Sequence, residues 1–160
     1  MSGTASDNSS TLDAAQTALL NAVVERLIPS DEHGPGAHEA HAAEYILGAL
    51  AADYQRYLPD YTAGLADLDA CAHAAYGRLF VSLEPSRQDA ILEDAERRQT
   101  SGDGPSPHSF FDLVLKHTRE GVFGDPRWGG NADRLGWGLI GYSGPRLTWA
   151  ANEQRIDYIE

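Results

Sequence analysis

Apolar residues recur every three to four positions along most of the chain, which is the spacing of an amphipathic α-helix. The first such run begins after Thr11, a residue type that caps helix N-termini, and continues to Leu27. Pro29 follows closely and disfavours the α conformation in the residue before it, so the helix should stop there. The sequence therefore predicts a first helix from about Thr11 to Leu27.

The same spacing predicts four further helices. We expect them over residues 37–57, 61–79, 86–98 and 109–122. Pro59 should end the first of these, and residues 99–107, rich in Gly, Ser, Pro and Asp, should form an exposed linker. No run alternates with a period of two over enough residues to indicate a sheet. We therefore predict an all-α fold, a compact irregular helical domain of about five helices with a C-terminal loop region rich in glycine and aromatic residues.

Residues 118–142 form the most unusual segment of the chain, with seven glycines and four large aromatic residues. Glycine tolerates positive φ and lets backbones approach closely, at a cost in chain entropy. Pro126 and Asn131 add residue types typical of turns. A flexible linker has no use for two tryptophans. We therefore expect an ordered aromatic loop that packs either against the protein's own helices or against another molecule.

This segment offers little chemistry of its own. It contains no His, Cys or Lys, so a nucleophile or an acid–base group that titrates near neutrality is missing. Its glycines match no phosphate-binding fingerprint. We predict no catalytic, cofactor-binding or metal-binding residue in the chain, and a partner-binding role for part of the segment. The candidate contact residues are Phe123, Asp125, Pro126, Trp128, Gly129, Gly130, Asn131, Trp137 and Tyr142.

Composition narrows the classes of partner. The 160 residues suit one domain, and 42% of them are hydrophobic, as in ordinary globular proteins. The formal net charge of -12 and the single lysine disfavour nucleic acid and anionic lipid as partners. Nowhere do 18 consecutive apolar residues occur, so no membrane span is expected. Cys71 is the only cysteine, and we expect it to be a small buried thiol on a helix.

Two alternatives to a partner-binding role stay open. His38, His41 and Glu44 recur every three residues, so they could share a helix face and serve a stand-alone metal-dependent enzyme, although a solvated polar face is the plainer interpretation. The chain could also be a self-contained structural helical protein whose aromatic loop closes over its own core. His117 is assigned no role, and the tyrosines of the helical regions are expected in the core or in an interface.

Groups of motifs occur in a fixed order between about Leu19 and Gly144. They are Leu27-Ile28-Pro29-Ser30-Asp31 with Pro35-Gly36-Ala37, Tyr61-x-x-Gly64-Leu65 with Phe80-x-x-Leu83, and Asp125-Pro126-x-Trp128-Gly129-Gly130-Asn131 with Gly136-Trp137-x-x-Ile140-Gly141-Tyr142. In this combination the chain resembles the gluconate 2-dehydrogenase subunit 3 family.

The resemblance implies a small non-catalytic subunit that binds and stabilises a large sugar dehydrogenase subunit of the FAD-dependent glucose–methanol–choline type. It implies no cofactor in this chain, FAD in the partner, and in many such complexes a cytochrome c subunit as well. Family members commonly carry an export signal, whereas residues 1–10 have neither a positive charge nor an apolar run. We expect a disordered tail at residues 1–10, a helical domain at 11–148 and a C-terminal arm at 149–160. The expected location is cytoplasmic as written, or periplasmic if a signal has been removed.

Overall fold

The computed structural model describes residues 11–100, 110–146 and 148, and the regular elements of these residues are all helical. One isolated antiparallel bridge joins Asp31 and Gly34. The elements are α1 (Ala14–Leu27), α2 (Ala42–Leu50), η1 (Gln55–Tyr57), α3 (Leu58–Tyr76), η2 (Phe80–Ser82), α4 (Pro85–Thr100), α5 (Phe110–Phe123), η3 (Pro126–Trp128), η4 (Ala132–Arg134) and α6 (Leu135–Leu139), where η marks a short 3₁₀ helix. The predicted all-α fold is confirmed.

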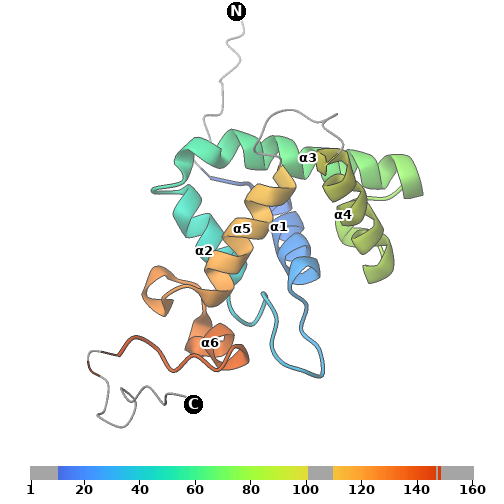
Figure 1. The fold of residues 1–160 in the computed structure, drawn as a ribbon. Helices are drawn as coiled ribbons and strands as arrows, with labels where there is room; N and C mark the ends of the chain where they lie inside the picture. The colour runs from blue at the N-terminus through green and yellow to red at the C-terminus, as the bar shows by residue number, and fades with distance from the viewer. Residues whose placement is uncertain (1–10, 101–109, 147, 149–160) are drawn as a thin grey trace, which may run out of the picture.

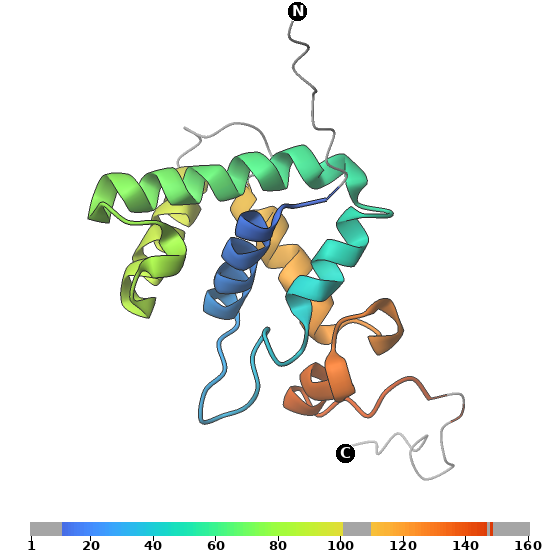
Figure 2. The ribbon, with the colours of Figure 1, turned by 180° about the vertical axis from the view of Figure 1, so that it is seen from behind.

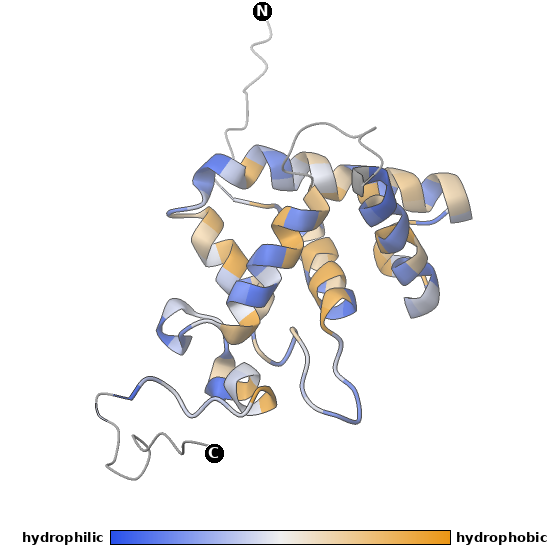
Figure 3. Cartoon of the chain, in the orientation of Figure 1, coloured by the Kyte–Doolittle hydropathy of each residue, from blue (hydrophilic) through white to orange (hydrophobic). Residues whose placement is uncertain are grey.

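The long helix α3 lies across one end of the molecule, and α1, α2 and α5 run away from it toward the opposite end (Figures 1 and 2). Helix α4 lies below the C-terminal half of α3, and α6 lies at the end far from α3. The buried positions of α1, α2 and α5 are mostly apolar, while α4 is largely polar (Figure 3). The largest fully buried apolar side chains include Leu20, Ile46, Tyr61, Leu65, Phe80 and Val114.

Helix α1 begins two residues later than expected, because Asp13 rather than Thr11 caps it. The Asp13 Oδ1 accepts a hydrogen bond from the backbone N–H of Gln16 at 2.8 Å, and the Gln16 Oε1 accepts one from the Asp13 N–H at 2.9 Å. This reciprocal capping box satisfies two backbone donors that have no partner within the helix. At the other end of α1, Arg26 binds both carboxylate oxygens of Asp89 on α4, at 2.7 and 2.9 Å.

The helix predicted over residues 37–57 is wrong at both ends, because α2 covers only Ala42–Leu50. Residues 37–41 form turns that fold back on the preceding loop, with the Ala37 N–H donating to the Ile28 carbonyl at 2.7 Å. His41 has a left-handed backbone, with φ of 58°, and α2 begins only after it. Pro59 does not end a helix but lies in the first turn of α3, where a missing N–H costs nothing.

The remaining differences are at helix ends. Helix α4 continues to Thr100, two residues beyond the prediction, and the rest of the predicted linker lies outside the described residues. The expected tail at 1–10 and arm at 149–160 lie outside them as well. Within the part of the chain that is described, no helix is long and apolar enough to cross a membrane.

Helices α2 and α5 approach each other closely because a glycine stands at their contact. A Cβ atom built on Gly121 of α5 would lie 2.9 Å from the Cα of Ala42 and 3.1 Å from its Cβ. These are distances that real Cβ atoms rarely or never show, and Ala42 is itself fully buried. The absence of a side chain at Gly121 therefore determines how close the two helices lie.

We expect Gly121→Ala to destabilise the protein by about 1–3 kcal/mol, because the helices must separate to admit the methyl group. Gly48, on the exposed side of α2, is the matched control, since a Cβ there would meet nothing within 4 Å. Gly48→Ala should stabilise the protein by about 0.5–1 kcal/mol through helix propensity alone. Urea unfolding of both variants measures the difference. Equal effects of the two substitutions would contradict the close-contact explanation.

Candidate partner-binding surface

Asn131 organises the aromatic loop through hydrogen bonds on every side. Its backbone N–H donates to the Gly121 carbonyl at 2.6 Å, and its Nδ2 donates to the Gly124 carbonyl at 2.7 Å. Its Oδ1 accepts hydrogen bonds from the N–H groups of Gly136, at 2.9 Å, and Trp137, at 3.4 Å. The residue is fully buried. The side-chain amide of Asn131 therefore connects the end of α5 to the start of α6.

The backbone around Asn131 is held in an unfavourable shape. Asn131, Asp133 and Arg134 all have positive φ, at 47°, 52° and 61°. For residues other than glycine this conformation costs on the order of 1 kcal/mol each, and such strain persists only where the surroundings impose it. The neighbouring Gly130 is required for space, since a Cβ there would overlap the carbonyl oxygen of Gly121. The loop thus has one defined conformation, as the sequence predicted.

Trp137 of α6 closes the loop from the inside. Its side chain is 7% exposed, and its Nε1 donates to the Phe123 carbonyl at 2.8 Å. The ring of Tyr142 meets it edge-on, with the ring centroids 5.0 Å apart. Gly136, one residue earlier, lies so near the Val122 carbonyl that any side chain would collide with it. Trp137 is therefore part of the loop's own packing.

Asp125 fixes the other turn of the loop. Its Oδ1 accepts from the backbone N–H of Arg127 at 3.0 Å, and its Oδ2 pairs with the Arg127 guanidinium at 2.8 Å. These hydrogen bonds from Arg127 hold the pKa of the Asp125 carboxyl below its usual value. The carboxylate caps the short helix η3 and so presents the residue at its end, Trp128.

Trp128 is the most exposed large apolar side chain among the described residues, at 69%. Three more belong to α6 and the residues that follow it, namely Leu139 at 41%, Ile140 at 61% and Tyr142 at 46%. We refer to these four side chains as the C-terminal apolar surface. Exposed apolar side chains grouped on an ordered backbone are typical of protein interaction sites.

The nine predicted contact residues thus divide into three groups by exposure. Trp128, Gly129 and Tyr142 are exposed, and Phe123, Asp125 and Pro126 are half-buried. Gly130, Asn131 and Trp137 are buried and hold the loop together. Leu139 and Ile140 are also exposed, although they are not among the nine.

The proposed metal-binding face does not form. His38 and His41 precede α2, and only Glu44 lies on that helix, so the three residues share no helical face. Over residues 11–100, 110–146 and 148, no cluster of His, Cys, Asp or Glu could hold a metal ion. The alternative of a stand-alone metal-dependent enzyme therefore gains no support from the described residues.

A buried cluster of tyrosines around His117 was missed. His117 of α5 is fully buried, and its Nδ1 lies 3.0 Å from the hydroxyl of Tyr61. The ring of Tyr54 stacks on the imidazole with the centroids 4.4 Å apart, and Tyr57 lies 5.5 Å away. One turn further along α5, Glu120 accepts hydrogen bonds from Tyr54 at 3.0 Å and Tyr45 at 3.2 Å. The partners come from three different elements, so spacing along the chain could not reveal the cluster.

Burial controls the protonation of this cluster. It raises the pKa of Tyr61 and Tyr45, with the Glu120 carboxylate adding to both effects, so both hydroxyls stay protonated and the Tyr45 hydroxyl donates to Glu120. Burial also lowers the pKa of His117, against the opposing influence of Glu120. Its Nε2 has no hydrogen-bond partner among the described residues. A neutral, enclosed imidazole of this kind joins α5 to α3.

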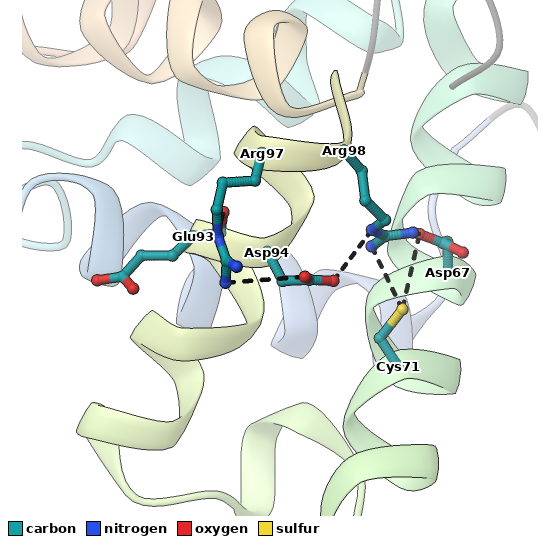
Figure 4. Close-up of polar contacts among 6 residues, drawn as sticks. All are labelled: Asp67, Cys71, Glu93, Asp94, Arg97 and Arg98. Atoms are coloured by element: carbon teal, nitrogen blue, oxygen red, sulfur yellow. Dashed lines mark hydrogen bonds and ion pairs between the residues drawn. The ribbon is translucent and has the colours of Figure 1, made fainter. Parts of the chain in front are cut away.

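The single thiol lies at the contact between α3 and α4 (Figure 4). Arg98 of α4 reaches across to α3, where its Nη2 donates to the Cys71 Sγ at 3.3 Å and its Nη1 contacts Asp67 at 3.2 Å. Asp94 pairs with the Arg98 Nε at 3.1 Å. Cys71 is half-buried on a helix, close to what was expected of it, and helps to join the two helices.

The family model of gluconate 2-dehydrogenase subunit 3 matches residues 14–144. This range covers most of the chain and includes both the helical core and the loop that Asn131 organises. The chain therefore belongs to the gluconate 2-dehydrogenase subunit 3 family, as its motifs indicated. Comparisons with curated proteins and with solved structures gave no significant match.

We expect Asn131→Ala to lower the free energy of unfolding by about 3 kcal/mol, because it leaves several buried backbone groups without partners. Asn131→Gly removes the same side-chain hydrogen bonds but accepts positive φ without strain, so it should cost about 1 kcal/mol less. Chemical denaturation followed by tryptophan fluorescence measures both. Wild-type stability of the alanine variant would show that Asn131 does not hold the loop.

Stability should also depend on pH through His117. Its folded-state pKa lies below its unfolded value of 6.5, so the unfolded chain binds more protons between the two. The free energy of unfolding should therefore fall as pH drops below about 6.5, by at most about 1.4 kcal/mol per pH unit, and level off below the folded-state pKa. Urea unfolding at pH 7.5, 6.5 and 5.5 measures this. His117→Gln should have the shallower pH dependence, and equal slopes would contradict the assignment.

Proposed function

We propose that this protein is a non-catalytic small subunit that binds and stabilises a large FAD-dependent sugar dehydrogenase subunit of the glucose–methanol–choline type. The observation that carries the proposal is the exposure of Trp128 on a backbone held rigid by Asn131. Membership of a family named for a dehydrogenase subunit supports a role inside such a complex. The FAD and the oxidation chemistry belong to the partner in this proposal.

The shape of the loop suits an interface. Holding three non-glycine residues at positive φ costs free energy. In a surface loop without a partner, no gain in binding would offset this cost. Tryptophan and tyrosine bury a large area on contact and lose little side-chain entropy, so they are common anchors in protein interfaces. Because the loop is already ordered, binding need not pay for ordering it.

The alternative of a self-contained structural protein makes a different prediction. If the loop only covered the protein's own core, its largest aromatic side chains should be buried. Trp137 follows that expectation, but Trp128 does not. The contrast between the two tryptophans favours a partner for the exposed one.

Co-expression with the large flavoprotein subunit, followed by size-exclusion chromatography, tests the proposal. We expect the chain to co-elute with a species that shows the flavin absorbance bands, and the flavoprotein expressed alone to be less stable or to aggregate. A colourless, monodisperse chain that elutes separately from a well-folded flavoprotein would overturn the proposal.

Trp128→Ala should weaken the complex by about 2 kcal/mol, the usual effect of removing an anchor residue, while leaving the stability of the isolated chain nearly unchanged. Trp137→Ala is the contrasting variant, since it removes a buried side chain and should destabilise the chain itself by about 3–5 kcal/mol. Titration calorimetry and thermal unfolding separate the two effects. Unchanged affinity for the Trp128 variant would rule out this contact.

A further inference from the structure

A second group of exposed apolar side chains lies far from the first. Tyr76 at the end of α3 is 37% exposed, and Leu79 and Val81 in the turn that follows are 51% and 44% exposed. Both views of the fold place this turn at the C-terminal end of α3, across the molecule from α6 (Figures 1 and 2). We refer to these three side chains, with Arg78 and Arg87 beside them, as the arginine-rimmed surface.

The turn that presents this surface is rigid. Phe80, between the two exposed residues, is fully buried. Its N–H donates to the Asp69 carboxylate at 2.8 Å, and its carbonyl accepts from the buried side-chain amide of Gln88 at 3.0 Å. With Phe80 held from both sides, Leu79 and Val81 stay at the surface. The sequence motif that contains Phe80 thus serves to present its neighbours.

The charge at this surface differs from the charge of the rest of the chain. Arg78 and Arg87 are exposed, and the Arg87 guanidinium lies 5.1 Å from the centre of the Tyr76 ring. Neither arginine pairs with a carboxylate among the described residues. The two arginines outnumber the single exposed carboxylate of this turn, Glu84, so the turn carries a local positive charge in a chain of net charge -12, which complements a surface that carries carboxylates.

The C-terminal apolar surface is too small to hold a permanent subunit by itself. Four partly exposed side chains amount to a few hundred Å² of contact, judging from the ~150–250 Å² that a whole aromatic side chain buries. Permanent complexes bury about 2,000–5,000 Å² in total, or roughly 1,000 Å² or more on each partner. A stable assembly therefore requires contact with a further part of this chain.

We propose that the arginine-rimmed surface is a second contact for the same large dehydrogenase subunit. The large subunit would then cover this chain from α6 to the turn between α3 and α4, and it would present carboxylates to Arg78 and Arg87. This inference rests on the proposed function. A second copy of the chain fits less well, because a two-fold contact through this surface would bring the arginines of both copies together.

Hydrogen–deuterium exchange on the chain alone and in the purified complex with the large subunit tests the inference. We expect the complex to protect residues 76–83 as well as residues 123–142. Protection at 123–142 without protection at 76–83 would overturn the second contact and leave the proposed function intact. Absence of protection in both segments would overturn both.

Substitutions then test whether the contact contributes to affinity. Leu79→Ser combined with Val81→Ser should weaken binding about tenfold, and Arg78→Glu combined with Arg87→Glu by at least as much, with a reduced dependence on salt. Ala63→Ser combined with Ala66→Ser, at exposed positions of α3, is the matched control and should bind as wild type. Circular dichroism melts verify that each variant folds. Wild-type affinity of both test variants would overturn the inference.

Discussion

The hydrogen bonds of one buried asparagine hold together the glycine-aromatic loop, which we propose as the partner-binding part of this protein. Asn131 joins the end of α5 to the start of α6, and its side chain makes three of these hydrogen bonds while its backbone makes two. No other residue type combines a donor, an acceptor and a tolerance for the left-handed backbone in so short a side chain. The exposure of Trp128 and the burial of Trp137 both depend on this arrangement.

The cluster around His117 connects that loop to the helical core through α5. Glu120 accepts two tyrosine hydroxyls one residue before Gly121, whose carbonyl receives the Asn131 N–H. The packing of α5 against α2 and α3 is thereby linked directly to the loop. The proposed interface would benefit from this connection, because movement in the helical core would otherwise be passed on to the loop.

The strained residues and the glycines together allow the loop to pack closely against the end of α5. Gly121, Gly130 and Gly136 each lie against a backbone segment that leaves no room for a side chain, and Asn131, Asp133 and Arg134 have positive φ. The free energy lost in this way is offset by the hydrogen bonds of Asn131 and by the burial of Trp137. As a result, Trp128 is held in solvent. This exposure is unfavourable, and burial against the proposed partner would offset its cost.

The sequence by itself determined the helical class, most helix positions, the ordered glycine-aromatic segment and the family, because these follow from local spacing and residue type. It did not determine the start of α2, since the contact of Ala37 with Ile28 outweighs local propensity there. Nor did it determine the role of Pro59, because proline suits the first turn of a helix as well as a break between helices. Only the tertiary structure separated Trp128 from Trp137 and gathered Tyr45, Tyr54 and Tyr61 around α5. Burial and hydrogen bonding between distant segments decide such features, and spacing along the chain does not encode them.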